Sequence, residues 1–140
     1  MSADFFDSNI FIYMFDERDL RKWQIARSLV HDALENGSAV ISFQVIQETL
    51  NVITRKLIDP VNQYDAIELL DKMLLPLWKV NPSPAFYKRG LDIKSRYQYS
   101  FYDSLIIAAA LEAGCKTLYS EDLQHGQQIE QMTIKNPFTE

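Results

Sequence analysis

The chain has 140 residues, which fits a single domain over 1–140, and its formal net charge is −5. This acidic balance argues against a protein that coats nucleic acid, although it is compatible with a nuclease that gathers acids around a cation. One cysteine, Cys115, excludes an internal disulfide, and no stretch approaches the ~20 apolar residues of a membrane span. We therefore expect a soluble cytoplasmic protein that does not enter a membrane.

The N-terminal part of the sequence alternates between short apolar runs and helical patterns. Residues 3–6 predict a first strand that stops at Asp7-Ser8-Asn9, where Ser8 or Asn9 is the expected cap of the next segment. Residues 20–35 predict a helix with one apolar stripe, ended by Asn36-Gly37. The pattern then predicts a strand over 39–41, a helix over 43–57 capped by Ser42, and a helix over 61–74.

The C-terminal part continues the alternation. The pattern predicts a strand over 75–80 despite Pro76, a helix from the turn at 81–84 to about residue 97, a helix from Ser100 to Ala113, a strand over 117–119 and a fifth over 130–134. Short apolar strands separated by helices imply an α/β fold, in which a central parallel sheet of four to five strands forms a three-layer α/β/α sandwich. Ligands of such sheets bind beyond the carboxyl ends of the strands.

Two aspartates follow predicted strands. Asp7 comes directly after the first strand, and Asp122 follows the strand at 117–119 after Ser120-Glu121. Both therefore lie at the sheet edge where ligands are expected. The competing explanation is a turn acid or a helix N-cap, and for Asp122 taken alone that explanation is favoured.

Asp103 lies on an apolar face of the helix predicted from Ser100. Ile106, Ile107 and Ala110 fall on the same face, at three, four and seven positions after the aspartate. A carboxylate that points inward needs a partner, and a metal ion is one. A first-turn acid that complements the helix dipole, with Ser100 as the cap, explains the same residue without a metal. Both interpretations stay open from the sequence.

Glu48 lies in the helix predicted after the second strand, away from that helix's main apolar stripe. From the residues alone, a solvated helix acid is the favoured interpretation.

The chain contains no local metal motif such as HExxH, paired cysteines or an EF-hand loop. Its two histidines, His31 and His125, also exclude a zinc site with three imidazoles.

Four segments, in order, resemble the motifs of the PIN domain family. Residues 6–13 (FDSNIFIY) resemble its opening, an aspartate after the first strand followed by a small hydroxyl residue and an asparagine. Gln47-Glu48 resembles its central glutamate. Residues 100–110 (SFYDSLIIAAA) resemble its third acidic motif, and residues 118–123 (LYSEDL) resemble its last motif. Each motif is weak alone, but their order and spacing agree across essentially the whole chain.

The size and layout most resemble the VapC toxins of bacterial and archaeal toxin–antitoxin pairs. The resemblance implies a parallel sheet between helices, RNA cleavage that depends on Mg²⁺ or Mn²⁺, and a VapB-like antitoxin that occludes the site. It implies that Asp7, Asp103 and Asp122 are direct or water-mediated metal ligands, and that Glu48 is a ligand or positions water. Asn9 and Ser120 are candidates to hold the acids through hydrogen bonds. Glu121 is a second candidate for the role of Asp122.

RNA must also be held by its backbone. Arg18, Arg21 and Lys22 form a basic group at the start of the first long helix, although a solvated helix face explains them equally well. The aromatic residues that follow Asn9, including Phe11 and Tyr13, are more often core residues. Their density is also compatible with a homodimer interface or an antitoxin groove.

Two other functions compete with the toxin. One is a stand-alone RNA-processing PIN nuclease without an antitoxin, which would keep the same chemistry. The other is a non-catalytic α/β binding or signalling domain. A phospho-acceptor receiver domain would show an adjacent acidic pair early in the chain, and a haloacid-dehalogenase-type phosphatase would have a second aspartate where Asn9 stands. Asp7-Ser8-Asn9 has neither feature.

Overall fold

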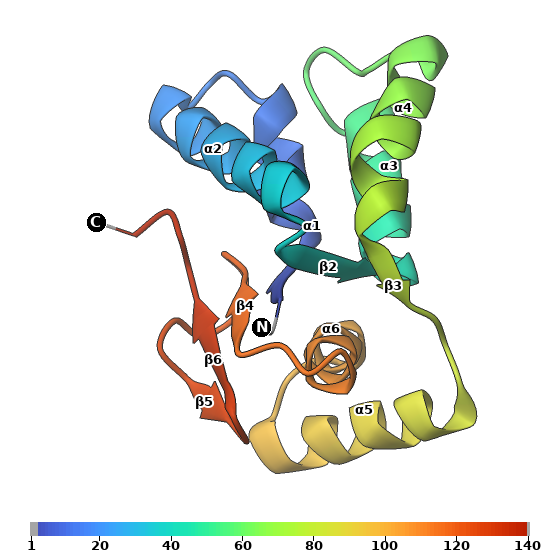
Figure 1. Cartoon of the computed structure of the whole chain (residues 1–140), viewed down its shortest axis with the longest axis vertical. Helices are drawn as coiled ribbons and strands as arrows, with labels where there is room; N and C mark the ends of the chain where they lie inside the picture. Colours follow the sequence, from blue (N-terminus) through green and yellow to red (C-terminus); the bar gives the residue numbers. More distant parts are fainter. Residues whose placement is uncertain (1–2, 140) are drawn as a thin grey trace.

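Strands from both halves of the chain form one sheet in the computed structural model, which describes residues 3–139. Within these residues the sheet has six strands in the order β3-β2-β1-β4-β6-β5 (Figure 1). Their bounds are β1 Asp4–Phe6, β2 Ala39–Ser42, β3 Trp78–Val80, β4 Thr117–Tyr119, β5 Gln128–Ile129 and β6 Met132–Lys135. All neighbouring strands are parallel except β5 and β6, which pair antiparallel.

The predicted α/β class with a central parallel sheet between helices is confirmed, but the sheet has six strands, one more than the four to five predicted, and it is not parallel at its C-terminal edge. Residues 130–134 do not form one strand. Glu130 has a positive φ of 54°, and the turn there separates β5 from β6. The result is a short hairpin that adds a sixth strand and the one antiparallel pair among the described residues.

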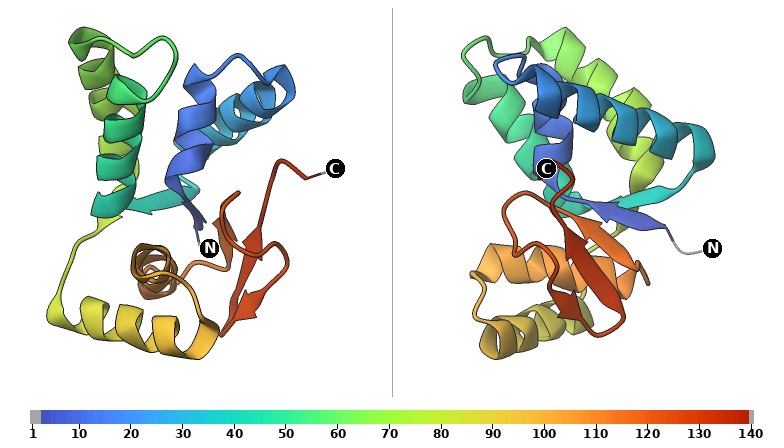
Figure 2. Two further views of the ribbon diagram at one scale, coloured as in Figure 1. Left: turned by 180° about the vertical axis from the view of Figure 1, so that it is seen from behind. Right: turned by 90° about the vertical axis from the view of Figure 1, so that its left-hand side faces the viewer.

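Helices cover both faces of the sheet. One side carries α1 (Ser8–Ile12), α2 (Leu20–Asn36), α3 (Phe43–Arg55) and α4 (Gln63–Leu69), and the other carries α5 (Pro84–Tyr97) and α6 (Phe101–Glu112) (Figures 1 and 2). The helix-rich layers on the two sides agree with the expected sandwich. Among the described residues, no helix is long and apolar enough to cross a membrane.

Several predicted boundaries are corrected by the structure. The strand predicted over 75–80 starts only at Trp78, because Pro76 lies in a 3₁₀ turn over Leu75–Leu77. The helix predicted over 61–74 is α4 followed by a π-helical segment, Leu70–Leu74. The cap of α1 is Asp7, whose side chain accepts from the Ser8 backbone N–H, rather than Ser8 or Asn9. Ser42 occupies the N-cap position of α3, but its hydroxyl makes no capping hydrogen bond.

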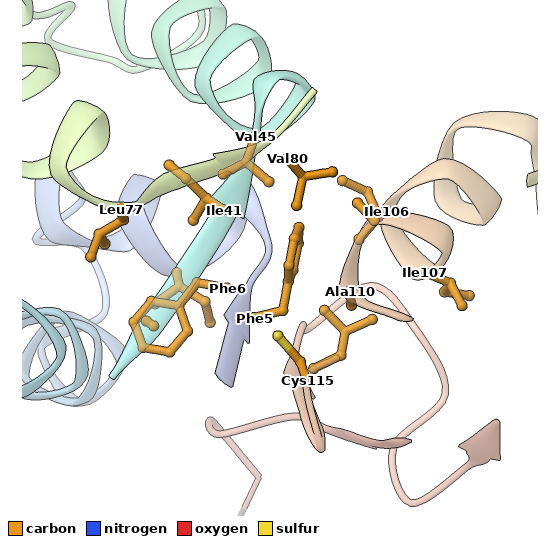
Figure 3. Packing of buried hydrophobic residues seen from close by; sticks show 14 of the residues in the cluster. Phe5, Phe6, Ile41, Val45, Leu77, Val80, Ile106, Ile107, Ala110 and Cys115 are labelled. Atoms are coloured by element: carbon orange, nitrogen blue, oxygen red, sulfur yellow. The ribbon is translucent and has the colours of Figure 1, made fainter. Parts of the chain in front are cut away.

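The hydrophobic core lies on both sides of β1. Phe5 and Phe6 are buried on opposite faces, as expected for consecutive strand residues, and Figure 3 shows Phe5 on the side of Ile106 and Ala110. The sequence predicts that only one face of α6 is apolar and buried. This prediction is wrong, because every residue from 104 to 111 is buried. The helix is enclosed between α5 and the sheet, so Asp103 lies just outside a fully buried segment.

The strand order also locates the functional edge of the sheet. From β1 the chain moves outward to β2 and β3, then crosses back to β4 on the other side of β1. The order therefore reverses between β1 and β4, and ligands of open α/β sheets bind at the carboxyl ends of such a pair. Asp7 follows β1 there, and its backbone N–H donates to Tyr119 O at the end of β4 at 3.0 Å.

Candidate active site

Asp7 is the most buried acid at this edge, with 3% of its surface exposed. Its Oδ1 accepts from the Ser8 backbone N–H at 2.7 Å, and its Oδ2 accepts from the Ser120 hydroxyl at 2.7 Å. The pKa of Asp7 is raised to about 7, and burial is the largest cause. The hydrogen bonds from Ser120 and Ser8 oppose this rise, and the nearby acids Glu48 and Asp122 add to it. The carboxyl group is thus held in one orientation in a place that disfavours its charge.

The loop after β4 brings Asp122 to the same edge. Ser120 Oγ, which donates to Asp7, accepts from the Asp122 backbone N–H at 3.2 Å. Asn9 in α1 makes two further links: its Nδ2 donates to Asp122 Oδ2 at 3.3 Å, and its Oδ1 accepts from the Glu121 backbone N–H at 3.2 Å. The hydrogen bonds expected of Asn9 and Ser120 are therefore present, and they tie α1 to the loop.

Glu48 reaches the site from the second turn of α3. It is half-buried, and burial raises the pKa of Glu48 against the lowering effect of hydrogen bonds from Gln44 and Ser8. Gln44 Nε2 donates to Glu48 Oε2 at 3.4 Å and to the backbone oxygen of Tyr102 at 3.1 Å. The fully solvated helix acid favoured from the residues alone is therefore wrong, because Glu48 is half-buried, hydrogen-bonded to Gln44 and close enough to Asp103 and Asp122 to be affected by their charges.

Asp103 lies in the first turn of α6. Its backbone N–H donates to the Ser100 hydroxyl at 3.2 Å, which makes Ser100 the cap of the helix as predicted. Burial raises the pKa of the Asp103 carboxyl, a separate hydrogen bond between that carboxyl and the Ser100 side chain lowers it, and Asp122 raises it. Asp103 is therefore the capped first-turn acid that one of the two interpretations expects, and its carboxylate is also close enough to Asp122 to be affected by its charge.

The four acids influence one another, and Asp122 is central among them. Asp122 contributes to the raised pKa of Asp7, of Glu48 and of Asp103, and Glu48 also contributes to that of Asp7. Among the described residues, no lysine, arginine or histidine forms an ion pair with any of the four. Four acids without a cationic partner are a suitable environment for a bound cation.

The type of cation can be inferred from the donors. All four side chains offer carboxylate oxygens, which suit Mg²⁺ or Mn²⁺. Within residues 3–139, no three His, Cys, Asp or Glu side chains are close enough to enclose an ion as they stand. Mg²⁺ commonly binds through one or two carboxylates and keeps several waters, so a closed protein cage is not required. The residues present fit such an open site.

Glu121 does not share the position of Asp122. Its carboxylate is held by Lys22, with Nζ 2.5 Å from Oε2, and by Tyr13, whose hydroxyl donates to Oε1 at 2.5 Å. Glu121 is thus paired on the α2 side of the loop, whereas Asp122 is linked to Asn9. The structure brings Asp7, Asp122, Glu48 and Asp103 together and sets Glu121 apart.

The three basic residues near the start of α2 also differ in their surroundings. Lys22 is engaged by Glu121, and Arg18 forms an exposed ion pair with Asp16 at 2.7 Å. Arg21 is exposed. Because Lys22 touches the loop that carries the site, the start of α2 lies at the rim of the carboxylate group.

Sequence reasoning missed one residue of this site, Gln44, and one neighbour of the site, Tyr13. Gln44 is 5% exposed and connects α3 to the start of α6. Its spacing of four residues before Glu48 places both side chains on one helix face, which was the available signal. The sequence indicates Tyr13 only as a core or interface aromatic, and nothing in its local sequence indicates its contact with Glu121.

Comparison with known proteins agrees with this geometry. The family model of the PIN domain matches residues 5–127, a span that includes all four acids. The chain belongs to the PIN domain family. A search of curated proteins finds no match to the sequence of this chain. The resemblance drawn from the four motifs is therefore confirmed at the level of the family.

Solved structures extend the likeness to toxin–antitoxin proteins. A toxin–antitoxin complex from Klebsiella pneumoniae superimposes with a TM-score of 0.70 at 18% identity, covering 96% of this chain and 98% of that one. The toxin VapC20 of Mycobacterium tuberculosis, described as cleaving the sarcin-ricin loop, gives 0.64 at 18% identity, with 86% and 90% covered. VapBC2 of Rickettsia felis, bound to a promoter DNA fragment, gives 0.67 at 14% identity, with 96% and 98% covered. At these identities the likeness shows the fold.

Proposed function

We propose that this PIN domain is a metal-dependent endoribonuclease that cleaves RNA phosphodiester bonds and is the toxin of a toxin–antitoxin pair. The observation that carries the proposal is the buried Asp7 at the end of β1, held by Ser120 and surrounded by acids without a cationic partner among the described residues. The similar fold of VapC20, a toxin described as cleaving the sarcin-ricin loop, supports the same reaction class.

The four acids have distinct roles in this proposal. Asp7, Asp103 and Asp122 bind Mg²⁺ or Mn²⁺ directly or through water, and Glu48 is a ligand or orients the attacking water. When bound, the ion supplies a Lewis acid for the scissile phosphate and a water of lowered pKa. Gln44 holds the Glu48 carboxylate, and Ser120 and Asn9 hold those of Asp7 and Asp122. These hydrogen bonds keep the carboxylates oriented before the substrate arrives.

The RNA backbone needs positive charge near the acids. Arg21 precedes Lys22 in the first turn of α2, Arg18 lies just before that helix, and Arg21 is exposed. We assign Arg21 the main contact to a phosphate, because Arg18 is paired with Asp16 and Lys22 with Glu121. Such a contact would strengthen binding to RNA without selecting its sequence.

The toxin role requires an antitoxin partner. The proposal is supported by the structural likeness to proteins of toxin–antitoxin complexes. It is also supported by a hollow of about 700 Å³ between residues 14–18 and 57–65, whose lining includes Met14, Phe15 and Leu57. These side chains come partly from the aromatic segment after Asn9, whereas Phe11 of the same segment is fully buried in the core.

We also propose a homodimer, which gel filtration of the purified chain would detect as twice the mass of one chain.

The direct test is cleavage of cellular RNA by the purified protein. We expect cleavage with Mg²⁺ or Mn²⁺ and none with EDTA, and we expect a cognate antitoxin to abolish it. Cleavage that no small co-encoded protein inhibits would favour the stand-alone nuclease. A well-folded protein that cleaves no RNA with either metal would instead favour a non-catalytic binding domain and overturn the proposal.

A further inference from the structure

A second polar cluster lies beside the carboxylate group and is not used by the proposed reaction. It consists of Tyr13, Lys22 and Glu121, which come from the segment after α1, the first turn of α2 and the loop after β4. Lys22 Nζ lies 2.5 Å from Glu121 Oε2 and 3.2 Å from the Tyr13 hydroxyl, and that hydroxyl donates to Glu121 Oε1. Each member therefore contacts both of the others.

Aromatic rings close the cluster around the lysine. Lys22 Nζ lies 4.9 Å from the centre of the Tyr13 ring and 5.9 Å from that of Phe138. The two rings pack edge to face, with centroids 4.9 Å apart. The side chains of Lys22 and Glu121 are only 27% and 24% exposed. An ion pair enclosed in this way is screened less by solvent than a surface pair and is held in one geometry.

The cluster is joined to the candidate metal ligands through the backbone of one residue. Glu121 donates its backbone N–H to Asn9 Oδ1, and Asn9 Nδ2 donates to Asp122 Oδ2. The side chain of Glu121 is held by Lys22, and the next residue along the chain is Asp122. Glu121 is therefore held at both its backbone and its side chain. Because Asp122 is the next residue, this also limits the directions in which the Asp122 side chain can point.

We propose that Lys22 is a positioning residue, which holds the Glu121 carboxylate against α2 and thereby orients Asp122 toward the other acids. This inference rests on the proposed function, because the site it supports is the proposed metal site. The pairing has two consequences. Glu121 does not become a fifth negative charge facing the cation, and the Lys22 ammonium does not compete with that cation for Asp122.

The alternative role for Lys22 is a contact with an RNA phosphate. That role needs an ammonium group that is free to meet the substrate, whereas this one already binds the Glu121 carboxylate and the Tyr13 hydroxyl and lies over the rings of Tyr13 and Phe138. The two roles also differ in what they affect. A positioning residue changes metal affinity in the absence of RNA, and a phosphate contact changes the salt dependence of RNA binding.

The test is Mn²⁺ binding by the full chain without RNA, measured by calorimetry and by the increase in Tm that Mn²⁺ produces. Lys22→Met removes the charge at similar size, Lys22→Arg keeps the charge, and Lys94→Met is the control at an exposed position of α5. Lys22→Met should weaken Mn²⁺ binding by about tenfold, the lower end for residues that support metal ligands. Lys22→Arg should restore most of the affinity, and Lys94→Met should match the wild type.

Glu121→Gln is a second variant in case Lys22→Met does not fold, which circular dichroism would reveal. It breaks the same ion pair from the other side and should also weaken Mn²⁺ binding. Wild-type Mn²⁺ affinity in folded Lys22→Met and Glu121→Gln would overturn the positioning role, and a reduced salt dependence of RNA binding in Lys22→Met would then identify a phosphate contact. If the wild-type protein itself does not bind Mn²⁺, the proposed metal site fails, and the inference fails with it.

Discussion

Asp7→Asn should stabilise the protein at pH 8 when no divalent metal is present. Burial raises the pKa of Asp7 from its ordinary value of 3.8 to about 7. Between these two values the folded state keeps a proton that the unfolded state releases, so the free energy of unfolding falls as the pH rises through this window. At pH 8 the wild-type protein carries the full destabilisation. Asparagine is neutral and carries none of it.

The size of the effect follows from the difference between the two pKa values. At 1.36 kcal/mol for each pKa unit, a change from 3.8 to about 7 corresponds to roughly 4 kcal/mol at pH 8. Asparagine can still accept from the Ser8 N–H, but its amide cannot accept from the Ser120 hydroxyl, which costs about 1–2 kcal/mol. The net gain should therefore be about 2–3 kcal/mol, or roughly 6–9 °C in Tm for a domain of this size.

The assay is thermal unfolding in EDTA at pH 4 and pH 8, with Asp32→Asn on the exposed face of α2 as the matched control. Asp7→Asn should melt higher than the wild type at pH 8 and slightly lower at pH 4, and Asp32→Asn should change little at either pH. Adding Mn²⁺ at pH 8 should raise the Tm of the wild type and leave that of Asp7→Asn nearly unchanged. A lower Tm for Asp7→Asn than for the wild type at pH 8 in EDTA would refute the reasoning.

Three further variants test other parts of the account. Ser120→Ala removes the donor to Asp7 and should lower metal-dependent RNA cleavage by about 10–100-fold, as measured by initial rates. Gly90→Ala places a Cβ 2.5 Å from Leu105 Cδ2 between α5 and α6, and should lower the free energy of unfolding in urea by about 1–3 kcal/mol. Arg21→Ala should weaken RNA binding alike for different RNA sequences and reduce its salt slope by about one.

Two of these variants have a control variant, and the third, Ser120→Ala, has a folding check. Ser95→Ala, at an exposed position of α5, should leave the urea midpoint unchanged, so an equal loss in both α5 variants would contradict the close packing at Gly90. Lys94→Met should keep the wild-type salt slope of RNA binding. Ser120→Ala should retain a cooperative thermal transition, and wild-type cleavage rates in this folded variant would remove Ser120 from the site.

The fold was predictable because its strands and helices carry strong local signals. The apolar runs at residues 3–6 and 39–41 and the cap at Ser100 led to correctly placed elements. The hairpin at the C-terminal edge was not predictable, because it depends on the left-handed conformation of Glu130, a residue that does not favour it. The π-helical segment over 70–74 has no sequence signal that we can identify.

The sequence proposes the members of the candidate site but not their geometry. Asp7 was supported by its place after a strand, whereas Glu48 and Asp122 depended on the family motifs. In the structure, Asp122 is the acid that influences the other three, although its own sequence favoured a turn residue. Its importance comes from contacts with Asn9 across 113 residues of chain, and a local pattern contains no information about such contacts.

The pairing of Glu121 with Lys22 is likewise a contact between residues that are far apart in the sequence. The two residues are 99 positions apart, and the neighbours of each in the sequence indicate another role. Lys22 falls with Arg18 and Arg21 in a basic patch, and Glu121 falls beside Asp122 as an alternative ligand. Only the arrangement of α2 beside the loop after β4 separates the acid that faces the site from the acid that is neutralised.

The central claim is that acids from four distant segments form one metal-dependent site for RNA cleavage. The most direct measurement compares RNA cleavage by the wild type, Asp103→Asn and Asp32→Asn over a Mn²⁺ titration, with EDTA as the blank. We predict Mn²⁺-dependent cleavage by the wild type and Asp32→Asn and a rate near the blank for Asp103→Asn. Equal, Mn²⁺-dependent cleavage by all three proteins would contradict the account.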